Sequence, residues 1–150
     1  MAKTVKGLNR ALAALGKFPQ ESFEILDQVF EANAMEITTN AKSIAPLDLG
    51  KLRQSIGYYK KEADGKTLAW AVGANTTGNA PYAPYVEFGT GTLVEVPKEM
   101  QDIAIKFKGK GIRKVNLRPR PYLYPSFVRQ IPNILEDVKS ELGALIKSKD

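Results

Sequence analysis

The 150-residue sequence predicts a single α+β domain, and three features of its hydrophobic pattern support that prediction. Apolar residues recur every three or four positions through residues 19–44 and again from about residue 126 onward, which is typical of amphipathic helices. Between these segments, in residues 52–73, the period changes to two, which is typical of strands. Helices and strands are therefore segregated along the chain, as in α+β domains.

The first 17 residues predict a short helical arm in front of the domain. Their apolar residues are spaced as on one helix face, and Gly16 supplies a C-terminal stop; they are Val5, Leu8, Leu12 and Leu15. The single domain then covers residues 18–150 and carries a basic loop at about 97–118. Whether the arm is docked, exchanged between copies or disordered before assembly does not follow from the sequence.

A long helix is predicted to begin near Pro19, because proline suits a first helical turn and Glu21 and Glu24 suit the positive end of the helix dipole. Pro46 ends it, since a proline disfavours helical geometry in the residue before it. The apolar stripe of this helix is Phe23, Leu26, Phe30, Ile37, Ala41 and Ile44. Core packing is the preferred interpretation of the stripe, and packing against a neighbouring subunit is the alternative.

The middle of the chain predicts a β-hairpin, with Ile56 and Tyr58 on its first strand and a turn at residues 63–66. The second strand carries Leu68, Trp70 and Val72. A further strand is expected at 93–96, a short helix at 97–106 and an extended segment at 118–125. The chain then ends in an amphipathic helix from about Ser126, packed by its stripe of Val128, Ile131, Leu135, Val138, Leu142 and Leu145.

Composition limits the chemistry that this chain can perform. It has neither cysteine nor histidine, which excludes disulfides, thiolate or imidazole metal sites, and nucleophilic catalysis that depends on histidine. This composition lowers the expectation of an enzyme, but carboxylate pairs, lysine and tyrosine remain possible catalysts. Our prediction is a protein that is not an enzyme and has no catalytic residue, cofactor or metal. Apolar runs are too short to cross a bilayer, so we expect no membrane contact.

The formal net charge of +6 is concentrated in one segment. No acidic residue interrupts its basic residues, which are Lys106, Lys108, Lys110, Arg113, Lys114, Arg118 and Arg120. Such a segment indicates contact with DNA or with an acidic neighbouring protein, and a solvated loop without a special role is the alternative.

A motif that mixes proline, acid, glycine and arginine follows the long helix, in the sequence APLDLGKLRQSI at residues 45–56. Read as an active site, it offers an Asp48–Arg53 pair and Ser55 as a nucleophile, but only a lysine could activate the serine. The preferred interpretation is a structural joint. Asp48 caps the next turn, Gly50 adopts a conformation closed to other residues, and Leu52 and Ile56 re-enter the core. Arg53 then binds either an acid or free carbonyls.

Two further segments carry recognisable chemistry. Tyr82, Tyr85, Phe88 and Glu87 could line a ligand pocket, but a wall where a loop meets the sheet is the preferred interpretation. A buried Glu87 needs a partner, for which Arg53 or Arg120 would serve. The segment RPRPYLYP, residues 118–125, fits a proline-rich peptide ligand less well than an extended lead into the last helix.

Taken in order, these three segments resemble the neck or tail-completion family of long-tailed bacteriophages, over residues 23–145. The resemblance rests on three sets of residues: Ala45, Pro46, Asp48, Gly50, Leu52, Arg53, Ser55 and Ile56; Tyr82, Ala83, Tyr85, Val86, Glu87, Gly89 and Thr90; and Arg120, Pro121, Tyr122, Leu123 and Pro125. The long basic segment between Thr90 and Arg118 departs from the family pattern.

The resemblance implies a structural protein of the virion at the head–tail junction, made in the cytoplasm of a bacterial host. Such proteins form a ring, here expected to be a hexamer, that joins the tail to a DNA-filled head. The implied partners are copies of the chain itself, the adjacent neck or head-closure proteins, the tail-terminator or tail-tube proteins, and DNA by nonspecific contact. A free nonspecific nucleic-acid-binding module is the alternative, because the net charge and interleaved tyrosines permit it.

Overall fold

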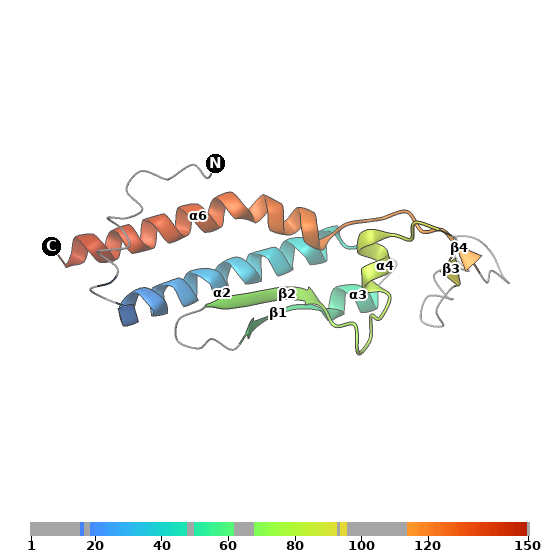
Figure 1. The fold of residues 1–150 in the computed structure, drawn as a ribbon, viewed down its shortest axis with the longest axis horizontal. Helices are drawn as coiled ribbons and strands as arrows, with labels where there is room; N and C mark the ends of the chain where they lie inside the picture. Colours follow the sequence, from blue (N-terminus) through green and yellow to red (C-terminus); the bar gives the residue numbers. More distant parts are fainter. Residues whose placement is uncertain are drawn as a thin grey trace.

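In the computed structural model, residues 16, 19–47, 50–61, 68–92, 94–95 and 114–149 are described. Two long helices run antiparallel, and a two-stranded sheet lies along one of them (Figure 1). This arrangement confirms the α+β prediction. Predicted features outside the described residues are the arm at 1–15, Asp48, the turn at 63–66, the helix at 97–106 and most of the basic segment.

Helix α2, Pro19–Ile44, has the bounds that the sequence predicts. Its last turn is followed by Ala45 and Pro46, where the backbone leaves the helix. Only part of the predicted stripe is in the core, because Ile37 and Ala41 are buried whereas Phe23, Leu26 and Phe30 are half-buried. Ile44 is exposed.

Helix α6, Leu123–Ser148, begins three residues earlier than expected, so Leu123, Tyr124 and Pro125 belong to its first turn rather than to an extended segment. Proline is tolerated there because the backbone N–H that it lacks has no partner within the helix. Pro132, in contrast, lies in the helix interior. The C-terminal end of α6 returns to the start of α2, where Lys149 Nζ lies 3.1 Å from Glu21 Oε1.

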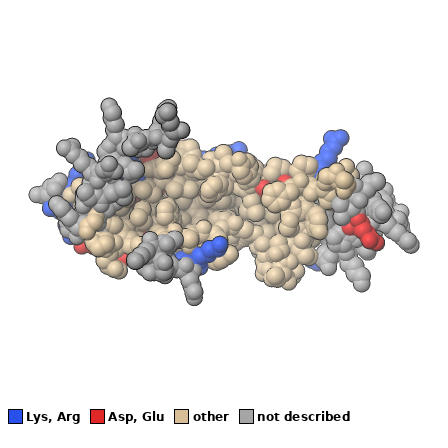
Figure 2. Space-filling view, viewed as in Figure 1, with Lys and Arg blue, Asp and Glu red and all other residues tan. Residues whose placement is uncertain are grey.

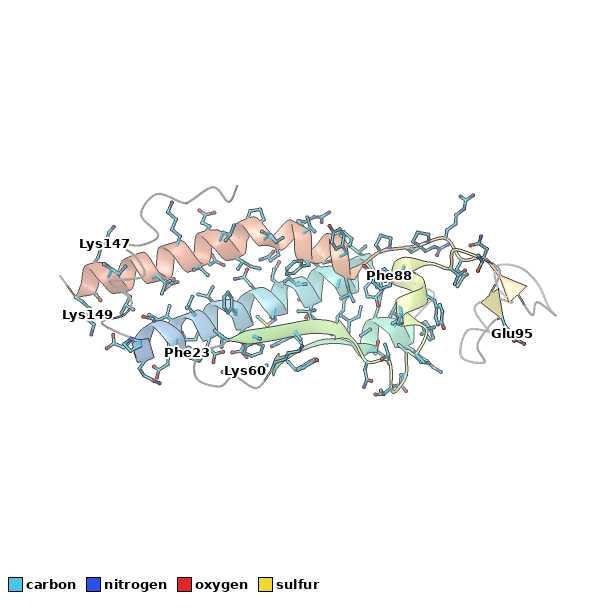
Figure 3. All side chains as sticks on the ribbon, in the orientation of Figure 1. Phe23, Lys60, Phe88, Glu95, Lys147 and Lys149 are labelled. Carbon is cyan, nitrogen blue, oxygen red and sulfur yellow. The ribbon has the colours of Figure 1, made fainter. Side chains whose placement is uncertain are left out.

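The strands β1, Ile56–Lys61, and β2, Ala69–Ala74, pair antiparallel, with Ile56 opposite Ala74 and Lys61 opposite Ala69. The hairpin prediction therefore holds for both strands. Asp27 of α2 holds the two strands on the helix. Its carboxylate accepts a hydrogen bond from Trp70 Nε1 at 2.9 Å and forms an ion pair with Lys60. Lys60 lies on the strand beneath α2, as labelled in Figure 3.

Two short helices lie beyond the sheet, α3 at Gly50–Ser55 and α4 at Ala83–Phe88, and neither was predicted. A second sheet pairs β3, Val94–Glu95, with β4, Lys114–Val115, which places a strand within the predicted range 93–96. The main hydrophobic cluster surrounds α3, α4 and the first turn of α6. Its buried members are Ala41, Ala45, Leu52, Ile56, Ala80, Tyr82, Ala83, Val86 and Tyr122.

The facing sides of α2 and α6 are partly polar. Asn33 of α2, which is buried, donates to Asp137 Oδ2 at 2.9 Å and accepts from Gln130 Nε2 at 2.8 Å. We call Asn33, Gln130 and Asp137 the polar seam. The predicted stripe of α6 is packed only in its C-terminal half, where Leu145 is buried and Val138 and Leu142 are half-buried. Beside the seam, the larger apolar side chains of α6 keep between 38% and 69% of their surface exposed: Tyr124, Phe127, Val128, Ile131 and Leu135.

Candidate functional site

The first motif forms the joint between α2 and the sheet. Arg53, on α3, reaches back to the end of α2, where its Nη2 and Nε donate to Ala45 O at 2.6 and 2.9 Å. Nη2 also lies 3.3 Å from Ser43 O. Of the two partners considered for Arg53, an acid or free carbonyls, the structure shows carbonyls. A guanidinium there supplies donors that the last turn of a helix lacks and complements its negative dipole end.

The remaining residues of this joint have structural roles. Leu52 and Ile56 are buried in the main cluster, as predicted. Ser55 Oγ donates to Leu52 O at 2.7 Å, so its proton is engaged with the backbone of its own helix. The expectation for Gly50 was wrong: it begins α3 without a positive φ, and a Cβ there would meet nothing within 4 Å. Pro46 is half-buried, and Asp48 lies outside the described residues.

Glu87 of the second motif closes the start of α6. It is 5% exposed, and both of its carboxylate oxygens accept backbone hydrogen bonds. Oε2 accepts from the N–H groups of Tyr122 and Leu123 at 2.7 and 3.0 Å, and Oε1 accepts from Tyr124 at 2.9 Å. The next residue, Pro125, has no N–H to satisfy. Glu87 therefore caps α6 from 36 residues away, a role that the expected pairing with Arg53 or Arg120 did not foresee.

Gly89 has the special backbone conformation that was expected of Gly50. Its φ is +68°, and a Cβ would lie 2.7 Å from both Leu117 O and Pro119 N. The neighbouring Thr90 binds the same backbone segment. Its N–H donates to Leu117 O at 3.0 Å, and its Oγ1 accepts from Leu117 N at 2.9 Å. Glycine is required here for both reasons, the left-handed φ and the close approach of another backbone segment.

Three tyrosines surround these contacts. Tyr82 is buried, and burial raises the pKa of its hydroxyl although a hydrogen bond with the backbone of Leu52 opposes the shift. Burial, reinforced by the charge of Glu87, raises the pKa of Tyr122 to about 12, so both phenols are neutral at ordinary pH. Tyr85 packs against the cluster from its edge. These rings form a wall of the core, which was the preferred interpretation of the segment.

The third motif contacts the second motif through its backbone. Arg120 donates its backbone N–H to Val86 O at 2.7 Å and has an exposed side chain, Pro121 is exposed, and Pro125 is half-buried. Three segments far apart in sequence therefore meet around one core; we call α3, α4, residues 116–122 and the first turn of α6 the motif region. Phe88 of α4 points outward from it (Figure 3) and is largely exposed.

The structure says less about the predicted basic contact. Lys106, Lys108, Lys110 and Arg113 lie outside the described residues, and Lys114 is described only as a backbone member of β4. Within the described ranges, no group of three or more acidic residues could hold a metal ion. The same part of the chain contains no helix long and apolar enough to traverse a membrane.

Comparison with known families now adds to this geometry. Residues 9–89 match the family HK97-gp10-like, described as "Bacteriophage HK97-gp10, putative tail-component". The match covers more than half of the chain. The chain belongs to this family. Searches of curated proteins and of solved structures gave no match.

Membership in the HK97-gp10-like family makes the chain a structural component of a bacteriophage tail and hence of the virion. The matched residues contain the first motif and end at Gly89, which is one residue short of the end of the second motif. The third motif lies beyond the match, yet Glu87 and Val86 bind it directly. The motifs that carry the resemblance and the residues of the family match therefore belong to the same part of the structure.

Sequence reasoning missed the polar seam. Asn33 interrupts the apolar stripe of α2 between Phe30 and Ile37, and Gln130 and Asp137 lie seven residues apart along α6. A buried polar residue within an apolar helix face is the signal that could have found it, because such a residue requires a polar partner on the facing element.

Proposed function

We propose that this chain is a neck or tail-completion protein that forms a hexameric ring and joins the phage tail to the DNA-filled head. One observation carries the proposal beyond tail membership. Among the motif residues, the polar side chains of Arg53, Ser55 and Glu87 bind backbone groups within the chain. These side chains stabilise the fold and do not face a substrate, which supports a structural function.

The proposed mechanism is the closure of a ring from rigid subunits. The motif region fixes the angle between α2, the sheet and α6, because each helix end is held by a side chain from another element. Copies packed head to tail close into a ring when the rotation between neighbours divides a full turn. Head-closure proteins would then contact one side of the ring, and tail-terminator or tail-tube proteins the other.

The basic segment is proposed to contact the DNA in the channel or an acidic neighbouring ring. Contact with DNA would occur through phosphates, and it would therefore be nonspecific and dependent on salt. Arg118 and Arg120, at the described end of the segment, are exposed beside β4. Lys106, Lys108 and Lys110 are the residues whose replacement tests this contact.

The function is tested by deleting the gene from the phage that encodes it and examining the lysate by electron microscopy. We expect DNA-filled heads and separate, complete tails, with joining restored by the wild-type gene in trans. A tagged copy should be found at the neck. A tag found along the tail or at its tip, or a deletion that leaves joined particles, would contradict the proposal.

Filter binding at moderate salt distinguishes the alternative, a free nucleic-acid-binding module. The purified chain is expected to bind DNA negligibly, because an isolated subunit presents only a few phosphate contacts. Replacement of Lys106, Lys108 and Lys110 by glutamine should reduce joining or DNA retention in particles. Tight binding by the free chain would favour the module, and unchanged particles would argue against a role for the segment.

A further inference from the structure

An apolar groove runs over α2 between the sheet and α6. Its volume is about 600 Å³. The floor consists of Phe30, Ala34 and Ile37 of α2, with Leu68, Ala69, Trp70 and Val72 on one side and Leu123, Tyr124, Phe127 and Ile134 on the other. Figure 2 shows that the middle of this face is uncharged, with the visible Lys and Arg atoms of the described residues toward its edges.

Asn33, whose amide lines the apolar groove, is not available to a ligand, and the indole N–H of Trp70 is engaged with Asp27. Its amide nitrogen donates to Val29 O and to Asp137, and its oxygen accepts from Gln130. Ligand sites usually combine apolar walls with a few polar groups that fix orientation. Apart from the hydroxyl group of Tyr124, the walls of this groove are apolar, so its chemistry fits a protein surface that is itself apolar.

The same chain carries a convex surface of that chemistry. Val128, Ile131 and Leu135 are exposed and are spaced by three and four residues, so they form one ridge along α6. We call these three residues the α6 ridge. Apolar anchors at this spacing are typical of a helix that packs into a groove of another protein.

The exposed apolar area on α6 is that of a functional surface patch. Tyr124 and Phe127 leave about 200 Å² uncovered if each aromatic presents about 150–250 Å². The α6 ridge adds on the order of 100–150 Å² at about 100 Å² per aliphatic side chain. Together these side chains expose on the order of 300–350 Å², which is the size of the largest apolar patch on a typical monomer and often marks an interaction site. Because a stable interface covers roughly 800 Å² per partner, the contact through this face would be one part of a larger subunit interface.

We propose that the α6 ridge of one copy packs into the apolar groove of the next copy. Ridge and groove are different surfaces of one chain, so the contact is heterologous and propagates until a ring closes. The inference rests on the proposed ring and names the surface through which it would form. In the assembly, α6 of one copy would lie against α2 of its neighbour at the usual helix spacing of about 8–10 Å.

The test measures the mass of the purified full-length chain by light scattering and native mass spectrometry. The ridge variant carries Ile131→Lys and Leu135→Lys, the groove variant carries Phe30→Lys, and the control carries Met35→Lys. Met35 is 53% exposed on α2 and does not line the groove, so it matches the variants in charge and apolar loss. Circular dichroism confirms that each variant is folded, and Val72→Lys replaces Phe30→Lys if the latter unfolds.

We expect the wild type and the control to form one large oligomer and each interface variant to be monomeric. An equal mixture of the two variants should form dimers and nothing larger, because one intact ridge and one intact groove remain in it. A wild type that stays monomeric at the highest concentration reached, or a two-fold dimer, would overturn the proposal. So would an oligomer that survives both variants but dissociates when residues 1–17 are deleted, because the arm would then be the occupant.

The two proposals fail in different ways. If the variants assemble like the wild type while a tagged chain is still found at the neck, the groove contact is wrong and the neck function stands. If ridge and groove control assembly but the tag is found elsewhere on the tail, the contact stands and the neck function is wrong.

Discussion

The motif region and the two-helix region, which consists of α2, the β1–β2 pair and α6 after its first turn, differ in what holds their elements together. In the motif region, the packing is mostly apolar, although Phe88 and Tyr124 are exposed, and the buried carboxylate of Glu87 binds backbone donors. In the two-helix region, the polar seam lies between the helices while large apolar side chains of α6 remain exposed. Both regions bury apolar residues, such as Val29 and Ile37 of α2, so the difference lies in the exposed apolar side chains of α6, which are of the kind that marks an interaction site.

This difference also separates two uses of polar residues. A carboxylate that accepts three backbone N–H groups satisfies a helix end and contributes directly to stability. A seam of amides between two helices contributes less, because apolar side chains of similar size would pack as well there. We expect the seam to act mainly on the register between α2 and α6, because its hydrogen bonds join Asn33 to Gln130 and Asp137 across the two helices.

The largest expected effect is in the motif region, at Glu87. Replacement by alanine leaves three backbone donors of α6 without their acceptor, and we expect the free energy of unfolding to fall by about 3 kcal/mol or more. Glu87→Gln keeps part of the cap and should cost less. Chemical denaturation measures both, with Glu136→Gln on the exposed side of α6 as control. A loss no larger than that of the control would show that the cap contributes nothing.

Next in size is Gly89→Ala. A methyl group there would be 2.7 Å from Leu117 O at a φ that side chains rarely adopt, and we expect a loss of about 2–3 kcal/mol. Gly143→Ala is the matched control, since its Cβ meets nothing within 4 Å and alanine favours a helix interior, so thermal stability should be unchanged or raised. Equal melting temperatures for the two variants would contradict the close approach seen at Gly89.

The polar seam should show a smaller and non-additive effect. Asn33→Leu leaves Gln130 facing an apolar side chain, for an expected loss of about 1–2 kcal/mol. Adding Gln130→Leu removes the other buried member of the seam, while the exposed Asp137 is hydrated, so stability should return to within about 0.5 kcal/mol of the wild type. A double-mutant cycle in denaturant measures this coupling. If the double variant is as unstable as the sum of the singles, the seam stabilises the fold as well as its register.

The smallest effect on folding is expected at the α6 ridge. Leu135→Lys should change the free energy of unfolding of a monomeric subunit by less than about 0.5 kcal/mol, because the side chain is mostly exposed. This change in the free energy of unfolding is measured in the background of the groove variant Phe30→Lys, which is expected to keep the chain monomeric. A large loss would mean that Leu135 packs within its own chain, and the contrast between the two regions would then disappear.

Several elements could be predicted because their signals are local. Pro19 and Pro46 mark the bounds of α2 through the backbone angles that proline allows, and the alternation around Tyr58 and Trp70 marks the strands. The start of α6 could not be found this way. Its cap is Glu87 rather than a nearby Ser, Thr or Asp, so the proline-rich segment before it gave a false impression of extended chain.

By itself, the sequence determined the α+β class, the ends of α2, the two strands and the three motifs of the phage tail family. Those features depend on backbone restriction and on side-chain period, which act over a few residues. The tertiary structure alone decided that Arg53 binds carbonyls, that Glu87 caps α6, that Gly89 is the required glycine and that the stripe of α6 is partly exposed. Each of these depends on which distant group a side chain meets, and only the packing of the elements fixes that.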